Sequence, residues 1–211
     1  NPLAAYLEIA QDGSVTILSS QFDMGQGSYH GIATLVVEEL GASWSQVDVR
    51  GVTGDLALYG NTAMGGVAQL TGGSTSMVTS WDRYRLAAAT AREMLVAAAA
   101  AEWGVPASEV NVVAGQILHQ ASGKAAGFGT FAKAAASLPV PTNVALKSPA
   151  DWTQIGNADL RRYDRVGKTT GQQDFTIDVK LPGMLTAVMI HPPKFGATLT
   201  AFDGGKAKAL K

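Results

Sequence analysis

Apolar and polar residues alternate in two short runs near the start of the chain, residues 6–9 and 14–18. Between the two runs stand Asp12 and Gly13, and an Asp-Gly pair in that position is typical of a hairpin turn. Apolar residues then recur at helical spacing from Ser28 onward, and Gly41 stands where such a helix would end. We therefore expect a hairpin, a loop and a helix, followed by a strand over residues 47–52.

The middle of the chain predicts a long loop and a long helix. Residues 54–73 are too rich in glycine and small residues for regular structure, and a loop of this length within a compact domain is typical of a binding loop. A helix is predicted from about Met77 to the break at Gly104-Val105-Pro106. Its apolar stripe and its many alanines indicate burial on most of its circumference.

The second half of the chain predicts shorter elements. A hairpin is expected over residues 110–119 and a short helix over residues 130–137. Three prolines then make residues 138–152 an extended surface connection, which favours a domain boundary in this part of the chain. Farther on, the apolar patterns predict three strands, over residues 175–179, 185–190 and 198–202.

Two polar segments offer groups that suit a flat cofactor bearing phosphate. Met24-Gly25-Gln26-Gly27 exposes main-chain amides and a carboxamide, and the stretch from Thr71 to Ser76 supplies four hydroxyls at the predicted N-terminus of the long helix, the end that attracts anions. Tight turns and helix caps use the same residue types, so each segment alone is weak evidence. A Rossmann or phosphate-loop site is disfavoured because the glycine spacing and the Gly-Lys-Ser/Thr signature are both missing.

Composition narrows the classes of function. The chain has 211 residues, 46% hydrophobic and 16% charged, with a formal net charge of -1, which is typical of a folded globular protein and gives no basic excess for nucleic acid. The absence of cysteine excludes an iron–sulfur cluster held by this chain. The three histidines, His30, His119 and His191, lie in no metal-ligand spacing, and we expect them to be partly exposed polar residues on loops or strand ends.

The sequence resembles the molybdopterin-binding large subunit of the xanthine dehydrogenase and aldehyde oxidase family, in the branch that contains the isoquinoline 1-oxidoreductase beta chain, over nearly the whole chain. The motifs that carry the resemblance are Asp23-Met24-Gly25-Gln26-Gly27 with Glu38-Glu39-Leu40-Gly41, Gln69-Leu70 with Thr71 to Ser76, Ser122-Gly123-Lys124, and Leu181-Pro182-Gly183-Met184-Leu185. The resemblance implies an α+β fold: a mixed-sheet and helix cofactor-binding domain over residues 1–160, then the start of a small alpha/beta hammerhead domain over residues 161–211.

The resemblance also implies a cofactor and the residues that contact it. The cofactor would be molybdopterin with molybdenum, in its cytosine dinucleotide form, in an enzyme that oxidises an aldehyde or an N-heterocycle with water as the oxygen source. The residues that match the cofactor-binding motifs are Gly25, Gln26, Gly27, Thr71, Gly72, Gly73, Ser74, Thr75 and Ser76.

Partners follow from the same resemblance. They are the remainder of the molybdopterin subunit, a [2Fe-2S] small subunit, a cytochrome c electron acceptor and a small-molecule substrate. Branch members often carry an export signal for folded proteins, which implies the periplasm, with the cytoplasm as the alternative.

Two departures limit what the chain can do alone. Asp23 stands where the family usually has glutamate, a change expected to adjust only the loop. No residue matches the family's active-site glutamate, so we assign no catalytic residue and no metal ligand here. Glu38 and Glu39 are expected on a solvated helix face and not as a paired-carboxylate site. The alternative function is a truncated, catalytically inactive domain that holds no cofactor.

Overall fold

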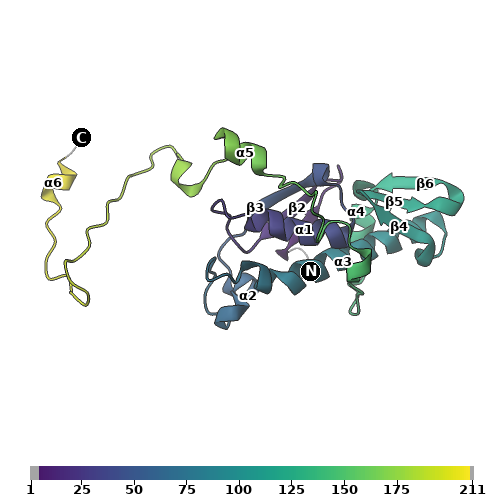
Figure 1. Cartoon of the computed structure of the whole chain (residues 1–211), viewed down its shortest axis with the longest axis horizontal. Coiled ribbons are helices and arrows are strands. Elements are labelled where there is room, and N and C mark those ends of the chain that lie inside the picture. The colour runs from purple at the N-terminus through teal and green to yellow at the C-terminus, as the bar shows by residue number, and fades with distance from the viewer. Residues whose placement is uncertain (1–4, 210–211) are drawn as a thin grey trace. The chain divides into compact units, whose positions relative to one another are not determined.

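The computed structural model describes residues 5–209 of the chain. Two compact units can be distinguished, one that ends at Gln173 and one that begins at Asp174. The first unit combines two small sheets with helices, so the predicted mixed-sheet and helix architecture is confirmed for it (Figure 1).

The first sheet is a mixed sheet of three strands in the order β1-β2-β3. β1 (Leu7–Ile9) pairs antiparallel with β2 (Val15–Ser19), as the Asp-Gly turn predicts, and β2 pairs parallel with β3 (Val47–Gly51). The crossover between the two parallel strands is α1 (Ser28–Leu40), followed by the 3₁₀ turn η2 (Trp44–Gln46). This β2-α1-β3 unit places the loop of residues 20–27 at the carboxyl end of β2.

α1 and α3 (Ser76–Trp103) pack side by side and run in the same direction. Near their starts the sulfur of Met77 lies 2.6 Å from the position that a Cβ of Gly31 would occupy, so the Met77 side chain packs directly against the backbone of α1. Near the end of α1, Glu39 contacts Arg85 and Arg92 of α3. The two helices therefore begin at the same end of the molecule.

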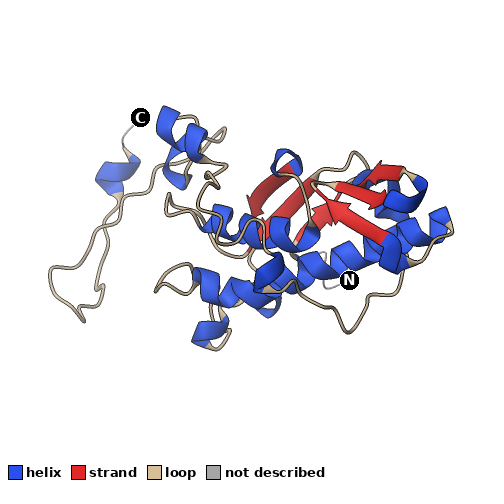
Figure 2. Cartoon of the chain, turned by 45° about the vertical axis from the view of Figure 1, so that its right-hand side comes forward, coloured by secondary structure: helices blue, strands red, loops and turns tan. Residues whose placement is uncertain are grey.

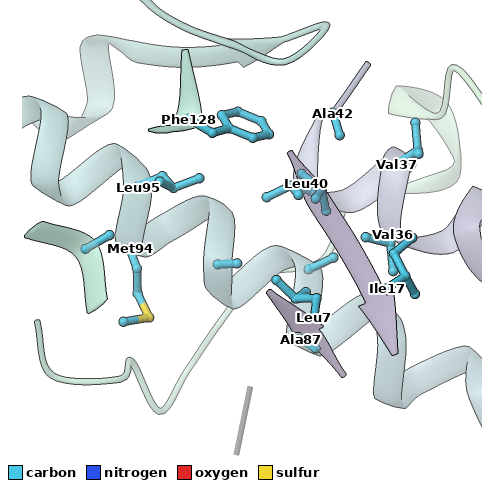
Figure 3. Close-up of a cluster of buried hydrophobic side chains, with 14 of the residues drawn as sticks. Leu7, Ile17, Val36, Val37, Leu40, Ala42, Ala87, Met94, Leu95 and Phe128 are labelled. Carbon is cyan, nitrogen blue, oxygen red and sulfur yellow. The ribbon is translucent and has the colours of Figure 1, made fainter. Parts of the chain in front are cut away.

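The core lies between these helices and the first sheet. Leu40, Leu95 and Phe128 are almost fully buried and come from α1, α3 and α4 (Phe128–Ala136) (Figure 3). α3 contributes mainly alanines to the core, which lets neighbouring elements approach its backbone closely, as its composition predicts. In both overall views this long helix passes both sheets (Figure 2).

The second sheet is antiparallel and extends the predicted hairpin by one strand. β4 (Val110–Val113) and β5 (Gln116–His119) pair as expected, and β6 (Lys124–Gly127) adds to the far side of β5. His119 is buried, contrary to the prediction that it is partly exposed. Its ring nitrogens lie 2.7 Å from the Ser122 hydroxyl and 3.0 Å from a carboxylate oxygen of Glu109, contacts that compensate its burial.

Short helical turns complete the first unit. Within the predicted irregular loop lie α2 (Leu56–Tyr59) and the 3₁₀ turn η3 (Thr62–Met64), which begin at the capping side chains of Asp55 and Asn61. The others are η4 (Ala107–Glu109), η5 (Gln120–Ser122), η6 (Pro149–Asp151) and α5 (Arg165–Thr170). Among the described residues, no helix combines the length and apolar character needed to cross a membrane.

Glu38 and Glu39 are fully buried, so the prediction that they lie on a solvated helix face is wrong. One carboxylate oxygen of Glu38 accepts hydrogen bonds from three consecutive backbone N–H groups, those of Thr153, Gln154 and Ile155, at 2.8, 2.6 and 3.1 Å. The carboxylate of Glu39 pairs with Arg85 at 2.7 Å. Glu38 therefore fastens the extended segment after α4 to the end of α1, and Glu39 fastens helix α3 to the same end.

The second unit contains none of the three predicted strands. Residues 174–209 hold only the 3₁₀ turn η7 (Thr176–Asp178) and the short helix α6 (Gly205–Lys208), and nearly all of their side chains are exposed. An alternating pattern forms a strand only where a neighbouring strand accepts its hydrogen bonds and a surface covers its apolar face. Neither is present among the described residues of this segment.

Candidate functional site

The two polar segments singled out in the sequence lie next to each other. The backbone N–H of Phe22 donates to the hydroxyl of Thr71 at 2.9 Å. The hydroxyl of Ser76 donates to the carboxamide oxygen of Gln21 at 3.1 Å. These two hydrogen bonds join chain positions about fifty residues apart, so the loop before α1 and the loop before α3 form one surface.

This surface lies at the carboxyl end of parallel strands. β2 and β3 both end there, and the backbone N–H of Val52 continues their ladder to the carbonyl of Ser19 at 3.1 Å. Ligands of α/β units bind in this position, where loops leave the strands and helices begin. The sequence pattern predicted a loop between a strand and a helix, and the parallel α3 places a second helix start beside it.

Gly25, Gln26 and Gly27 form a tight turn. Both glycines have positive φ angles, 105° and 97°, which favour glycine. The carboxamide of Gln26 folds back into the turn: its nitrogen donates to the carbonyl of Phe22 at 2.8 Å and to the Ser28 hydroxyl at 3.2 Å, and its oxygen accepts from the N–H of Met24 at 2.5 Å. In this conformation Gln26 shapes the turn with its own side chain.

Asp23 holds the turn against the start of α1. Its carboxylate accepts from the N–H of Gly25 at 2.8 Å, from the N–H of Tyr29 at 3.1 Å and from the Lys168 ammonium at 2.6 Å. Burial by itself raises the pKa of Asp23, but the hydrogen bonds from Lys168 and from the two backbone amides outweigh it and the pKa is lowered. The positive end of α1 therefore already faces a carboxylate.

A second ion pair lies over the same turn. Arg162 donates to both carboxylate oxygens of Asp164, and its guanidinium carbon is 3.0 Å from the position that a Cβ of Gly27 would occupy. Lys168 also contacts Asp164, at 2.5 Å. Although burial raises the pKa of Asp164, its hydrogen bonds to Arg162 and Lys168 lower it to about 2. Two cations and two carboxylates thus balance each other beside the turn.

The residues before α3 form a turn that is held by a buried side chain. Asn61 is buried and donates to the Thr75 hydroxyl at 2.8 Å, and that hydroxyl donates in turn to the carbonyl of Gly72 at 2.8 Å. Ser74 adopts a positive φ of 58° although it is not glycine. The hydroxyls of Thr71, Thr75 and Ser76 all have protein partners, whereas that of Ser74 has none among residues 5–209.

The start of α3 remains open for an anion. Thr75, its N-cap residue, makes no side-chain capping bond, and the first turn contains no acidic residue. Within the described part of the chain, the backbone N–H groups of Ser76, Met77 and Val78 donate to no acceptor. Free N–H groups at the positive end of a 28-residue helix bind phosphate well, so the residues present fit a phosphate-bearing cofactor.

Sequence reasoning missed two buried residues that support this surface, Gln21 and Asn61. Both are polar and at least 98% buried, with exposed fractions of 2% and 1%. The alternation along β2 could have identified Gln21. Every second residue of the strand points inward, namely Val15, Ile17 and Ser19, and the same alternation places residue 21 inward. Asn61 shows no such pattern in its glycine-rich loop.

Comparison with known proteins agrees with this geometry. Residues 1–179 match the model of a protein family described as a molybdopterin cofactor-binding domain. The chain belongs to this family. The match covers most of the chain and includes both segments of the site, and it confirms the resemblance stated from the sequence motifs.

Three curated relatives align with almost the whole chain. The beta chain of isoquinoline 1-oxidoreductase from Brevundimonas diminuta is 30% identical over 97% of this chain and 30% of its own length. A membrane-bound aldehyde dehydrogenase of Gluconacetobacter polyoxogenes, named as a pyrroloquinoline-quinone enzyme, is 31% identical over 98% of this chain and 26% of its own. A nicotinate dehydrogenase subunit from Pseudomonas putida is 29% identical over 99% of this chain and 17% of its own.

This chain therefore spans less than a third of the length of each of these relatives. Among solved structures, quinoline 2-oxidoreductase from Pseudomonas putida 86 aligns with 69% of this chain and 19% of its own, at 19% identity and a TM-score of 0.41. That likeness is too distant to assign a role to any residue.

Proposed function

We propose that this molybdopterin cofactor-binding domain contributes one wall of the cofactor site of a molybdenum hydroxylase. The enzyme would be an oxidoreductase that oxidises an aldehyde or an N-heterocycle, with water as the oxygen source. The names of the relatives support this proposal, since they include an isoquinoline oxidoreductase, an aldehyde dehydrogenase and a nicotinate dehydrogenase.

One observation carries the proposal: the turn of residues 25–27 and the open start of α3 are joined into one surface by the Phe22–Thr71 and Gln21–Ser76 hydrogen bonds. The free N–H groups of Met77 and Val78 would receive the phosphate end of the cofactor. Exposed Phe22 and Met24, 48% and 67% accessible, offer apolar contact to a flat heterocycle near the glycine turn.

The roles of the protein residues in this proposal are binding and orientation. Gly25, beside which no protein atom lies within 4 Å of a Cβ position, lets the backbone approach a flat ligand closely, Gly27 lets Arg162 pack on the same turn, and Asp23 and Asn61 hold the two loops in place. The bound cofactor supplies the redox chemistry. No general base is assigned to this chain, because the carboxylates of Asp23 and Asp164 are ion-paired with a lowered pKa and those of Glu38 and Glu39 fasten other segments.

The cytosine dinucleotide form of the cofactor, the remainder of the large subunit, a [2Fe-2S] small subunit and a cytochrome c acceptor belong to the same proposal. Because this chain contains no cysteine, an iron–sulfur cluster with thiolate ligands would have to be held by another part of the enzyme. We also propose the periplasm as its compartment, on the resemblance to exported branch members.

Metal and pterin analysis tests the proposal. The chain is purified from cells that make the cofactor, and molybdenum is measured by mass spectrometry alongside the fluorescent pterin released on denaturation. The proposal predicts both signals in the purified chain. A folded protein that carries neither would support the alternative of an inactive domain. Bound pyrroloquinoline quinone in their place would exclude molybdopterin as the ligand.

A further inference from the structure

Gln21 lies beneath the junction of the two loops. It lies two residues after the end of β2, is 2% exposed, and its carboxamide oxygen accepts from the hydroxyl of Ser76, the first residue of α3. In this structure the oxygen end of the carboxamide faces Ser76. The nitrogen end, Nε2, is therefore turned away from the Ser76 hydroxyl while remaining beside the start of α3.

The Nε2 group of Gln21 donates to no acceptor within residues 5–209, although most buried polar groups in proteins are paired. The side-chain atoms that are both unpaired and sealed from solvent in this part of the chain are His30 Nδ1, Ser80 Oγ and Trp152 Nε1. Gln21 Nε2 is not among them. It therefore keeps contact with solvent and remains free to donate to an acceptor.

We propose that Gln21 is a binding residue of this site, whose Nε2 donates to an oxyanion at the start of α3. The oxyanion is the phosphate of the pterin cofactor, so this inference rests on the proposed function. The start of α3 offers the free N–H groups of Ser76, Met77 and Val78, and the carboxamide of Gln21 lies beside it through its bond to the Ser76 hydroxyl. The first turn of α3 contains no acidic side chain to oppose the anion.

A carboxamide suits this position because its two ends have different roles. The oxygen binds the Ser76 hydroxyl and the nitrogen binds the ligand, so one side chain orders the helix start and contacts the phosphate. Gln21→Glu separates the two roles, since a carboxylate still accepts from Ser76 but offers no donor and adds a negative charge. Gln21→Met has similar length and removes both. Gln120→Glu, at an exposed position in η5, is the matched charge control.

Anaerobic equilibrium dialysis against molybdopterin cytosine dinucleotide tests the inference, with bound pterin measured as its fluorescent oxidation product. Loss of one hydrogen bond to a charged group should raise Kd roughly ten- to 100-fold in Gln21→Met, and further in Gln21→Glu. Gln120→Glu should match the wild type. Inorganic phosphate, dialysed separately, reports whether the phosphate alone accounts for the effect. Circular dichroism confirms that each variant is folded.

The outcomes are distinguishable. If the folded wild type binds no cofactor, the proposed function fails and the ligand named here fails with it. If the wild type binds and folded Gln21→Met binds equally well, only the role of Gln21 is overturned. A measurement on the wild type needs no variant: the Gln21 side-chain NH₂ signals in a ¹⁵N spectrum should shift when the cofactor is added, and unchanged signals would contradict the inference.

Discussion

The backbone N–H of Phe22 donates a 2.9 Å hydrogen bond to the hydroxyl of Thr71, and this bond joins the loop before α1 to the loop before α3. Thr71→Val keeps the shape of the side chain and removes the acceptor. We expect a stability loss of only about 1 kcal/mol, because water can replace the acceptor at this exposed contact. Cofactor retention should fall more clearly, because the two loops would no longer be held in register. Chemical denaturation and pterin analysis of the same samples measure both effects.

Thr142→Val provides the control for that prediction. Thr142 is exposed and its side chain makes no hydrogen bond among the described residues, so the same chemical change should leave stability and pterin content unaltered. Equal pterin retention in both variants would show that the Phe22–Thr71 bond does not organise the site.

The buried pair of Glu39 and Arg85 should contribute strongly to stability. Their closest atoms lie 2.7 Å apart, and the guanidinium lies 4.9 Å from the ring centre of Trp81 and 5.5 Å from that of Trp152. Glu39→Gln leaves Arg85 buried without its counter-charge, which we expect to cost about 3 kcal/mol in urea unfolding. The exposed pair of Asp48 and Arg50 is the comparison, and Asp48→Asn should change stability by less than about 0.5 kcal/mol. Equal effects would contradict this account of the pair.

Glu38 should make stability depend on acid pH. Burial raises its pKa, but the hydrogen bonds from Gln154, Ile155 and Thr153 outweigh this and the pKa is lowered. A lowered native pKa means that the stabilisation is complete above the unfolded value of about 4.3 and is lost as pH falls through the native value. Glu38→Gln should cost about 2–3 kcal/mol at pH 7. The difference from the wild type should shrink below about pH 4. A difference independent of pH would show that the ionised carboxylate is not what holds residues 153–155.

His30 should be a source of instability at mildly acid pH. Its ring stacks on Trp44 at 5.2 Å, and its Nδ1 atom is sealed from solvent without a partner among the described residues. Burial lowers its pKa, Asp164 raises it, Arg162 and Lys168 lower it, and the net shift is downward. The neutral ring is therefore favoured in the fold, and stability is lost as pH falls from about 6.5 through the native value.

His30→Phe keeps the stacked ring and removes the unpaired nitrogen. We expect it to raise the free energy of unfolding by about 1 kcal/mol at pH 7.5, and by more at pH 5.5. Unfolding curves at the two pH values measure this. A variant less stable than the wild type at pH 5.5 would contradict the prediction.

Local patterns predicted most of the first unit because its elements depend on nearby residues. The Asp12-Gly13 turn, the helix from Ser28 to Gly41 and the long alanine-rich helix all formed where periodicity and end signals placed them. The end signals act through backbone conformation: a glycine at φ 74° ends α1 and another at φ 68° ends α3.

Long-range polar partners could not be predicted in this way. Glu38 looks like a solvated helix residue until residues 153–155, more than a hundred positions later, place their N–H groups against it. The strands expected over residues 175–202 failed for the opposite reason, because their alternating pattern finds no partner strand in the described residues. At the site, sequence identified the two loops but not Gln21, whose role depends on the approach of Ser76.

Backbone amide mapping by NMR tests the central claim most directly, because it reports which residues one ligand touches. The ¹⁵N-labelled chain is titrated anaerobically with molybdopterin cytosine dinucleotide, and shifts are followed at every assigned amide. We predict that the largest shifts occur together at residues 25–27 and at residues 73–78, with the same binding curve. Shifts confined to one of these segments, or centred on the β4–β6 sheet, would contradict a single cofactor surface formed by both loops.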